Sequence, residues 1–446
     1  MKRTANTSIL AKRDTFISLI IIGSMYFIIG SVSWINAILI PYFKVAFQLN
    51  NNQSYFVTLA FYISYFFISV PASYLLKKVG FKTGLMVALW IMAFGAFLFV
   101  PAAHFNTYTV FLIGLFSIGT GLAILQTAIN PYITILGPKE RAAQRISIMG
   151  VCNKLAGILA PLLFAYAILR PTDNEMFKQI PQMLPDERDL VLHELLKRVM
   201  VPYTIVAGVL FLLGLFVKRS PLPEIDTEHE SGEVLAANSD KKSVFQFPQL
   251  ILGAIALFLH LTAQILSIDT VINYAESMGK TLVEAKTLPS ITLFSTMVGY
   301  VIGIIGIPKI FSQQTALKFC AVLGLIISLL TVMAKGNLTI AIPFLHFSHT
   351  FDLSIWFLCS LGLANSLIWA GIWPLALDGL GRFTKIGSSI MIMGLVANAL
   401  APSFYSYISN FVGLRDAYWI LIPCFLFIIF YAFYGHTLRK WQLKKH

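Results

Sequence analysis

The sequence predicts an all-α membrane protein with twelve transmembrane helices arranged in two six-helix halves. Of its 446 residues, 57% are hydrophobic and only 12% are charged, whereas soluble domains carry about a quarter charged residues. Apolar stretches long enough to cross a hydrocarbon layer, roughly 20 residues as a helix, recur along nearly the whole chain. The short alternating segments of a transmembrane barrel are not found. Because backbone groups in lipid must be satisfied internally, these stretches are expected to be helices.

The expected spans follow the apolar stretches. They cover residues 16–41, 54–76, 84–103, 108–137, 145–169, 201–217, 248–275, 286–308, 315–334, 353–379, 387–411 and 416–437. If both termini are cytoplasmic, most of the 33 Lys and Arg residues fall in cytoplasmic loops, as the positive-inside rule requires. We therefore expect a multi-pass protein of a bacterial inner membrane with both termini in the cytoplasm.

A polar outer loop is expected at residues 170–200. It ends in a helical piece whose apolar residues recur at i, i+3, i+4 and i+7, which is typical of an amphipathic helix. Those residues are Leu192, Leu195, Leu196 and Val199. This pattern predicts a helix that lies on the outer surface of the membrane.

An internal repeat divides the chain. Leu136-Gly137 and Ile148–Gly150 recur as Leu380-Gly381 and Ile392–Gly394 with the same offset of 244 residues, at equivalent junctions between spans 4 and 5 and between spans 10 and 11. The polar, aperiodic segment between the halves has the composition of a linker. The predicted organisation is a half at 1–217, a cytoplasmic linker at 218–246 and a half at 247–446.

Several other classes of protein are disfavoured. The net charge of +13 sits in alternate loops of a membrane protein, so it does not indicate nucleic acid. The four cysteines lack metal-ligand spacing. His193–Lys197 begins like a zinc-protease motif, but Lys197 replaces the second histidine, and no nucleophile elbow or phosphate loop is present. We expect neither an enzyme nor a metal site.

Five motifs carry a family resemblance. They are Lys77–Gly84 between spans 2 and 3, Asn36–Pro41 in span 1, Leu125–Tyr132 in span 4, and Gly362–Ser366 with Leu377–Gly381 in span 10. The first resembles the basic, glycine-containing loop of the major facilitator superfamily, with Lys where many members carry Asp. The others are similar to its fucose/glucose-galactose sugar:cation symporter branch. The resemblance covers nearly the whole chain and implies sugar import.

The departures from this branch concern cation coupling. Where the resemblance implies an Asp in span 1, a Glu in span 4 and a Glu in span 7, this sequence has Ala37, Gln126 and Gln264. A proton relay needs a group whose charge can change, which an amide cannot supply.

Candidate sugar ligands in the first half are amides. Gln126 and Asn130 are four residues apart, so they share one face of span 4. Amides both donate and accept hydrogen bonds, as sugar hydroxyls require. Asn36 in span 1 is a third candidate, and Pro131 is expected to loosen span 4. Amides that only join helices are the alternative interpretation.

The second half offers a comparable set. Asn365, Trp369 and Trp373 recur at i, i+4 and i+8 in span 10, and an aromatic face can stack on a pyranose ring. We expect Asn365 and Trp369 at the sugar and Trp373 in packing. Gln264 in span 7 and Asn398 in span 11 complete the expected substrate site.

Four titratable residues are expected within or at the ends of spans. Asp269 and His260 in span 7 are the candidates for cation coupling. The alternatives are a salt bridge or a gating contact for Asp269 and a structural hydrogen bond for His260. Lys154 and Asp378 are expected near cytoplasmic ends, in snorkelling or inner-gate ion pairs.

The predicted function is secondary-active import of a hexose such as glucose, galactose or fucose, or of N-acetylglucosamine, by alternating access. Cation coupling is expected, with a co-transported proton or sodium ion and no other cofactor. An uncoupled facilitator and a non-transporting sugar sensor remain as alternatives. The expected partners are the sugar and the lipid bilayer, the protein is expected to be a monomer, and no nucleic-acid partner is expected.

Overall fold

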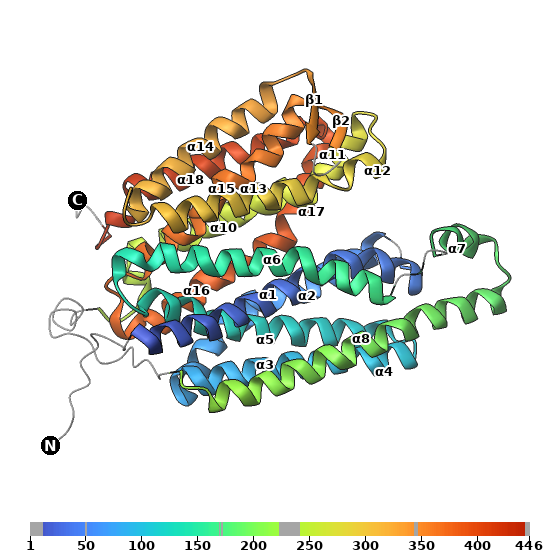
Figure 1. Ribbon diagram of the computed structural model, residues 1–446, viewed down its shortest axis with the longest axis horizontal. Coiled ribbons are helices and arrows are strands. Elements are labelled where there is room, and N and C mark those ends of the chain that lie inside the picture. Colours follow the sequence, from blue (N-terminus) through green and yellow to red (C-terminus); the bar gives the residue numbers. More distant parts are fainter. Residues whose placement is uncertain are drawn as a thin grey trace, which may run out of the picture. The chain divides into compact units, whose positions relative to one another are not determined.

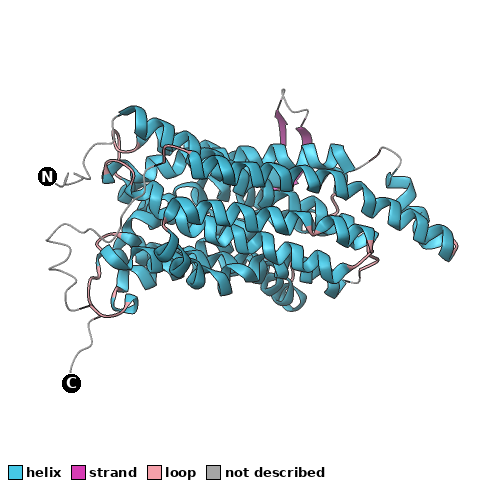
Figure 2. Cartoon of the chain, turned by 90° about the horizontal axis from the view of Figure 1, so that it is seen from below, coloured by secondary structure: helices cyan, strands magenta, loops and turns pink. Residues whose placement is uncertain are grey.

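The computed structural model describes residues 12–49, 51–168, 170, 173–222, 241–342 and 347–441. In these residues the chain is helical apart from one β-hairpin (Figure 2). Twelve helical segments within this described part are long and apolar enough to cross a membrane. The predicted fold class and number of spans are confirmed.

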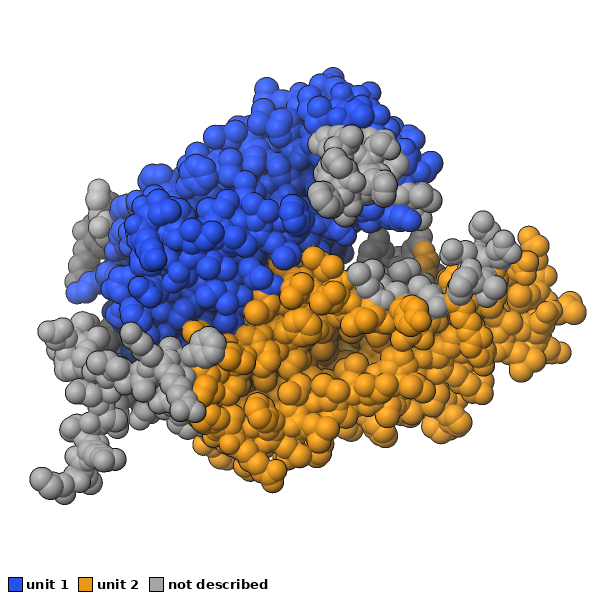
Figure 3. Space-filling view, in the orientation of Figure 1, with its two compact units in different colours: residues 1–8, 130–151, 227–446 blue, residues 9–129, 152–226 orange. Residues whose placement is uncertain are grey.

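Contacts divide the chain into two compact units (Figure 3). We call residues 9–129 and 152–226 the N-terminal unit, and residues 1–8, 130–151 and 227–446 the C-terminal unit. The segment 130–151 joins the C-terminal unit because its helix contacts that unit directly. Gln144 Nε2 donates to the carbonyl oxygen of Ile304 at 2.6 Å. The division into halves at 217 and 246 remains a prediction, and most of the predicted linker lies outside the described residues.

The helices up to residue 219 are labelled in Figure 1. They are α1 (Lys12–Ala46), α2 (Asn51–Val79), α3 (Phe81–Phe97), α4 (Phe99–His104), α5 (Tyr108–Ile135), α6 (Ala142–Ile168), α7 (Asp173–Gln179) and α8 (Pro185–Arg219), with short 3₁₀ helices at Lys139–Arg141 and Ile180–Gln182. Close packing of α3 on α8 depends on Gly214, where a Cβ atom would lie 2.7 Å from the Trp90 ring.

The remaining elements begin at Val244. They are α10 (Pro248–Asp269), α11 (Val271–Ser277), α12 (Leu282–Ala285), α13 (Leu288–Gly306), α14 (Gln313–Met333), β1 (Asn337–Ile342), β2 (Phe347–Asp352), α15 (Leu353–Leu377), α16 (Thr384–Met393), α17 (Ala397–Val412) and α18 (Leu421–Phe433), with 3₁₀ helices at Val244–Gln246, Gly381–Phe383, Gly394–Val396, Asp416–Ile420 and Gly435–Thr437. The strands β1 and β2 pair antiparallel, with Asn337 opposite Asp352.

Helix α15 is the most buried span of the C-terminal unit and packs against α10, α13 and α14. Small residues allow this approach, since a Cβ atom at Gly362 would collide with the carbonyl oxygen of Thr292 on α13. Span 11 is interrupted by the 3₁₀ turn Gly394–Val396, where Gly394 lies against the backbone of α10 at Phe258. This turn sets the direction of α17.

The prediction of a separate surface helix in the outer loop is wrong. Residues 185–219 form one continuous helix, α8, which passes through Pro202. Its apolar residues Leu195, Leu196 and Val199 are at most 1% exposed, and Tyr42 Oη donates to the carbonyl oxygen of Leu195 at 2.6 Å. The amphipathic face is therefore covered by protein, because α1 packs on it.

Candidate functional site

The amide of Gln126 is buried in the N-terminal unit and has an aromatic partner. Gln126 on α5 is 7% exposed, and its Nε2 donates to the Tyr65 hydroxyl of α2 at 3.0 Å. Tyr65 is 1% exposed and stacks on Tyr62, with ring centroids 6.0 Å apart. Helix α2 comes this close because Gly119 on α5 offers no side chain against Phe61 and Ser64.

Asn130 follows Gln126 by one turn on the same face of α5. It is 2% exposed, and Pro131 comes next inside the helix. A proline removes one backbone donor from the helix, which marks a place where it can bend. The structure thus places two buried amides on one face of α5, as their spacing predicted, and Pro131 follows them inside the helix.

Tyr65 is a site residue that the sequence reasoning missed. The spacing of Tyr62 and Tyr65 at i and i+3 on an apolar helix is a signal that could have found this aromatic pair. Its pairing with Gln126 joins residues 61 positions apart, which the sequence did not indicate.

The structure does not describe the side chain of Asn36, which lies outside the part of α1 with defined side chains. Its backbone belongs to α1, two residues after Trp34. Its predicted role as a sugar ligand therefore remains a prediction.

The face of α15 carries the predicted stripe. Asn365 is fully buried, and neither atom of its amide has a hydrogen-bond partner among the described residues. Trp369 is half-buried, and its ring centroid lies 5.6 Å from that of Trp373 at an interplanar angle of 50°. Trp373 is fully buried, as expected of a packing residue. Most buried side-chain amides are hydrogen-bonded, so Asn365 is unusual.

Helices α10 and α17 contribute the other predicted ligands. Gln264 on α10 and Asn398 on α17 are both half-buried, and His260, one turn before Gln264, is fully buried. Helix α10 packs against both α15 and α17. The structure therefore assembles the helices that carry Gln264, Trp369 and Asn398 within the C-terminal unit.

The charged candidates differ in position. Asp269 is the last residue of α10, and its side chain is exposed, so it lies at the end of the span rather than within it. Asp378 follows α15 and makes the predicted ion pairs, with Arg439 at 2.7 Å and Lys139 at 3.6 Å. Lys154 does not snorkel, because it is 5% exposed and lies in the middle of α6.

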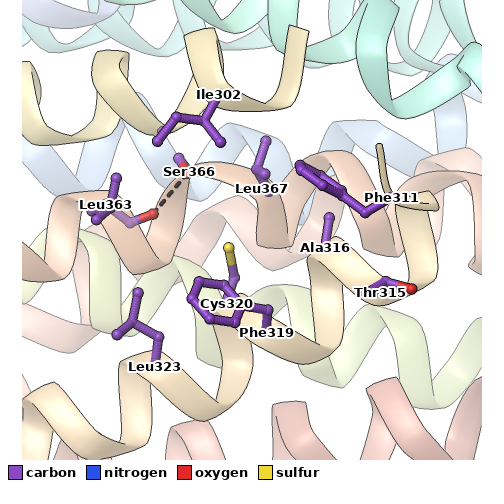
Figure 4. A pocket seen from close by; sticks show the side chains of 11 residues that line it. Ile302, Phe311, Thr315, Ala316, Phe319, Cys320, Leu323, Leu363, Ser366 and Leu367 are labelled. Carbon is purple, nitrogen blue, oxygen red and sulfur yellow. Dashed lines mark hydrogen bonds between the residues drawn. The ribbon is translucent and has the colours of Figure 1, made fainter. Parts of the chain in front are cut away.

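An apolar cavity of about 310 Å³ lies between α13, α14 and α15 (Figure 4). Ile302, Phe319, Cys320 and Leu323 are among its lining residues, and the one hydrogen bond drawn there joins Ser366 Oγ to the carbonyl oxygen of Leu363 at 2.7 Å. None of the predicted site residues lines it. A sugar needs several convergent polar groups, so this cavity is unsuited to the predicted substrate.

Comparison with known proteins decides the family. The model of the major facilitator superfamily matches residues 22–402. The chain belongs to this superfamily.

Two curated relatives are similar over almost their whole length. A glucose/galactose transporter of Brucella abortus is 30% identical over 416 residues, which are 92% of each chain. The L-fucose-proton symporter of Escherichia coli is 28% identical over 428 residues, or 94% of this chain and 93% of that one. The resemblance predicted from the motifs is confirmed.

A solved structure agrees with the fold. The crystal structure of a transporter of this superfamily, FucP, in the outward conformation matches with a TM-score of 0.79 and 26% identity, and covers 94% of this chain and 99% of that one. A second crystal structure, of the E. coli fucose:proton symporter, also gives 0.79. The predicted fold of two six-helix bundles is that of this superfamily.

Proposed function

We propose that this protein imports a small sugar across the bacterial inner membrane, coupled to a cation. The relatives are named as transporters of glucose and galactose or as a symporter of fucose and protons. The observation that carries the proposal is the pair of buried amide faces on α5 and α15. Gln126 with Asn130, and Asn365 with Trp369, occupy spans 4 and 10, which are equivalent in the predicted repeat.

The chemistry of these faces suits a neutral hexose. Amides donate and accept hydrogen bonds together, as vicinal hydroxyls do, and the half-buried indole of Trp369 offers a flat apolar surface to the C–H face of a pyranose. The substrate class is therefore a hexose such as glucose, galactose or fucose, or N-acetylglucosamine. A single well-placed amide is sufficient to discriminate one hydroxyl.

Transport would follow alternating access, in which the two bundles rock about a midplane site. Gln126 and Asn130 would hold the sugar from span 4, Asn365 and Trp369 from span 10, and Gln264 and Asn398 from spans 7 and 11. Pro131 lies inside the continuous helix α5, and the 3₁₀ turn Gly394–Val396 interrupts span 11. A proline or a turn of this kind is a place where a helix can bend as access changes.

The cosubstrate is a proton or a sodium ion. The fucose-transporting relative is named a proton symporter, and this name favours a proton as the cosubstrate of the present protein. The neutral residues Ala37, Gln126 and Gln264 favour a second candidate, an uncoupled sugar facilitator, because none of them can carry a proton. A non-transporting sugar sensor is a third, weaker alternative.

The proposal includes the predicted setting of the protein. We propose that both termini lie in the cytoplasm, that the protein functions as a monomer in the lipid bilayer, and that it has no enzymatic activity or nucleic-acid partner.

The experiment is sugar counterflow in liposomes that contain the purified protein. Liposomes are loaded with one unlabelled sugar at a time from a panel of hexoses and N-acetylhexosamines, and entry of a labelled trace of the same sugar is followed. Transient accumulation of at least one sugar supports the proposal. Absence of exchange for every sugar, in liposomes that contain correctly folded protein, would sink the substrate assignment.

A further inference from the structure

Lys154 is a charged residue in the middle of a membrane-crossing helix. It lies twelve residues after the start of α6 at Ala142, or about 18 Å along the helix axis. It is 5% exposed. A charge at this depth is costly and is usually paired or functional, so Lys154 requires an explanation that snorkelling does not give.

The ammonium group lies on an aromatic face. Lys154 Nζ is 5.0 Å from the ring centroid of Trp34 on α1. Gly157, one turn later on α6, makes room for this indole, because a Cβ atom there would lie 2.7 Å from Trp34 Cδ1. The indole therefore packs across α6 between Lys154 and Gly157, in the geometry of a cation–π contact.

The surrounding helix contact is tight. Gly30 on α1 lies against the carbonyl oxygen of Asn153, where a Cβ atom would collide. Asn153 Nδ2 donates to the carbonyl oxygen of Tyr26 at 3.3 Å. The position of the lysine is thus set by a packed interface of α1 with α6.

No ion pair of Lys154 is found among the residues that the structure describes. The positions that share its face of α6, Gly150, Val151, Gly157 and Ile158, carry no ionisable group.

The ionisable groups on the packed elements are few. On α1, the positions one turn from Trp34 are apolar, glycine or serine, and Tyr26 contributes its backbone. Cys152 lies on another face of α6. Arg145 donates hydrogen bonds to backbone carbonyl oxygens, among them that of Ile133 at 3.0 Å. The Tyr300 ring of α13 packs against Gly150.

These contacts make the charge of Lys154 sensitive to whether water reaches the contact between α1 and α6. The indole face stabilises the ammonium, whereas a low-dielectric interior disfavours it. If water reaches this helix contact in one conformation and not in the other, the proportion of charged to neutral Lys154 differs between the two conformations. A group with this property can bind a proton on one side and release it on the other.

We propose that Lys154, held on Trp34, is the residue that couples sugar import to protons in this protein. It replaces the carboxylates that the family resemblance implies at positions 37, 126 and 264, where this chain has Ala37, Gln126 and Gln264. This inference rests on the proposed sugar import. Lys154 binds a proton in the outward-facing state and releases it to the cytoplasm, so that one proton travels with each sugar. It acts through α1 and α6 and is not a sugar ligand.

The test is proton-driven accumulation in liposomes that contain the full-length protein and variants. A pH gradient of one unit can drive an accumulation of about tenfold when one proton accompanies each sugar. We expect the wild type to approach this value. Lys154→Gln is expected to equilibrate the sugar without accumulation while it still exchanges labelled sugar in counterflow.

The variant Lys154→Arg separates charge from titration. Arginine keeps the positive charge but does not release its proton, so Lys154→Arg is also expected to lose accumulation. Uptake by both variants should depend less on pH than uptake by the wild type. If Lys154→Gln fails to insert, Lys154→Arg carries the test, since it preserves charge and length.

Lys318→Gln is the matched control. Lys318 on α14 also lies 5.0 Å from an aromatic centroid, that of Phe433, but it is half-buried. This variant should accumulate sugar like the wild type. Full accumulation by Lys154→Gln or Lys154→Arg would overturn the proposal. A wild type that exchanges sugar but accumulates none under the gradient would instead overturn the coupling in the proposed function, and with it the role of Lys154.

Discussion

The charges of the C-terminal unit and the mid-helix charge of the N-terminal unit are held in opposite ways. Arg415 is surrounded by partners at the ends of spans, where Nη2 donates to Asp352 Oδ1 at 2.7 Å and Nε donates to the Tyr274 hydroxyl at 2.9 Å. Lys154 has one aromatic face. Arg415 thus has several hydrogen-bond partners, whereas the contact found for the Lys154 ammonium group among the described residues is the Trp34 ring.

The N-terminal unit shows the same contrast within itself. Arg198 pairs with Asp173 at 2.9 Å, and this pair joins α7 to α8. Both side chains are largely buried. Ion pairs thus join elements within each unit, whereas the polar groups in mid-span are the ones that we propose for transport. The following predictions test that distinction, from the largest expected effect to the smallest.

The largest effect is expected from Gln126→Ala. Removal of this amide deletes a proposed sugar ligand and leaves the Tyr65 hydroxyl without its donor, a loss of about 2 kcal/mol and hence roughly 30-fold in uptake. Tyr65→Phe should lose less, because the amide remains. Uptake in liposomes measures both. The matched control is Gln314→Ala, which changes an exposed glutamine of α14, and loss of uptake there as large as in Gln126→Ala would contradict the assignment.

Asn365→Leu should separate function from stability. Because neither amide atom of Asn365 has a hydrogen-bond partner among the described residues, replacement by leucine, which has the same branching and the same number of side-chain heavy atoms, is expected to leave the Tm unchanged or raise it. Sugar uptake should nevertheless fall about tenfold through loss of one hydrogen bond to the substrate. Thermal unfolding in detergent and counterflow are measured on the same preparation. A Tm that falls by several degrees would show that Asn365 supports the fold instead.

Gly157→Ala should disturb the lysine site through packing. The added methyl group meets the Trp34 ring at 2.7 Å, and such overpacking costs about 1–3 kcal/mol. We expect a lower Tm and weaker proton-driven accumulation. Gly208→Ala on α8 is the control, because nothing lies within 4 Å of its Cβ position. If the two alanine variants have the same Tm and the same proton-driven accumulation, the contact of Trp34 with α6 does not contribute to transport.

The smallest effect concerns pH. Partial burial acts to raise the pKa of Asp352, but hydrogen bonds from Ser354 and Gly336 and the Arg415 charge outweigh it and hold the pKa below its usual range. A lowered pKa in the folded state stabilises the fold above the unfolded value of about 4. This contribution is lost as the pH falls through the folded value. Thermal unfolding of Asp352→Asn should therefore depend less on pH in the acid range than that of the wild type, and identical slopes would refute this.

Much of the architecture was predictable because it depends on local sequence. Apolar length alone gives the twelve spans, and spacing alone puts Gln126 and Asn130 on one face of α5. Positive charges in alternate loops give the orientation, which remains a prediction. These features need no knowledge of which helices touch.

The rest depends on contacts between distant residues. Tyr65 reaches Gln126 only because α2 packs on Gly119 of α5. The burial of Lys154 depends on Trp34, and the amphipathic start of α8 is covered by α1. The sequence of one span does not show which helices pack against it. For this reason the sequence predicted that Lys154 snorkels and that the start of α8 lies on the membrane surface.

The central claim, that sugar and protons move together, is tested most directly by proton flux on addition of sugar. Energy-depleted vesicles that contain the protein are suspended in weakly buffered medium, a sugar that passes the counterflow assay is added, and the external pH is recorded with an electrode. The account predicts a transient rise in external pH that a proton ionophore abolishes. Sugar entry with no change in external pH, at any starting pH between mildly acid and neutral, would contradict it.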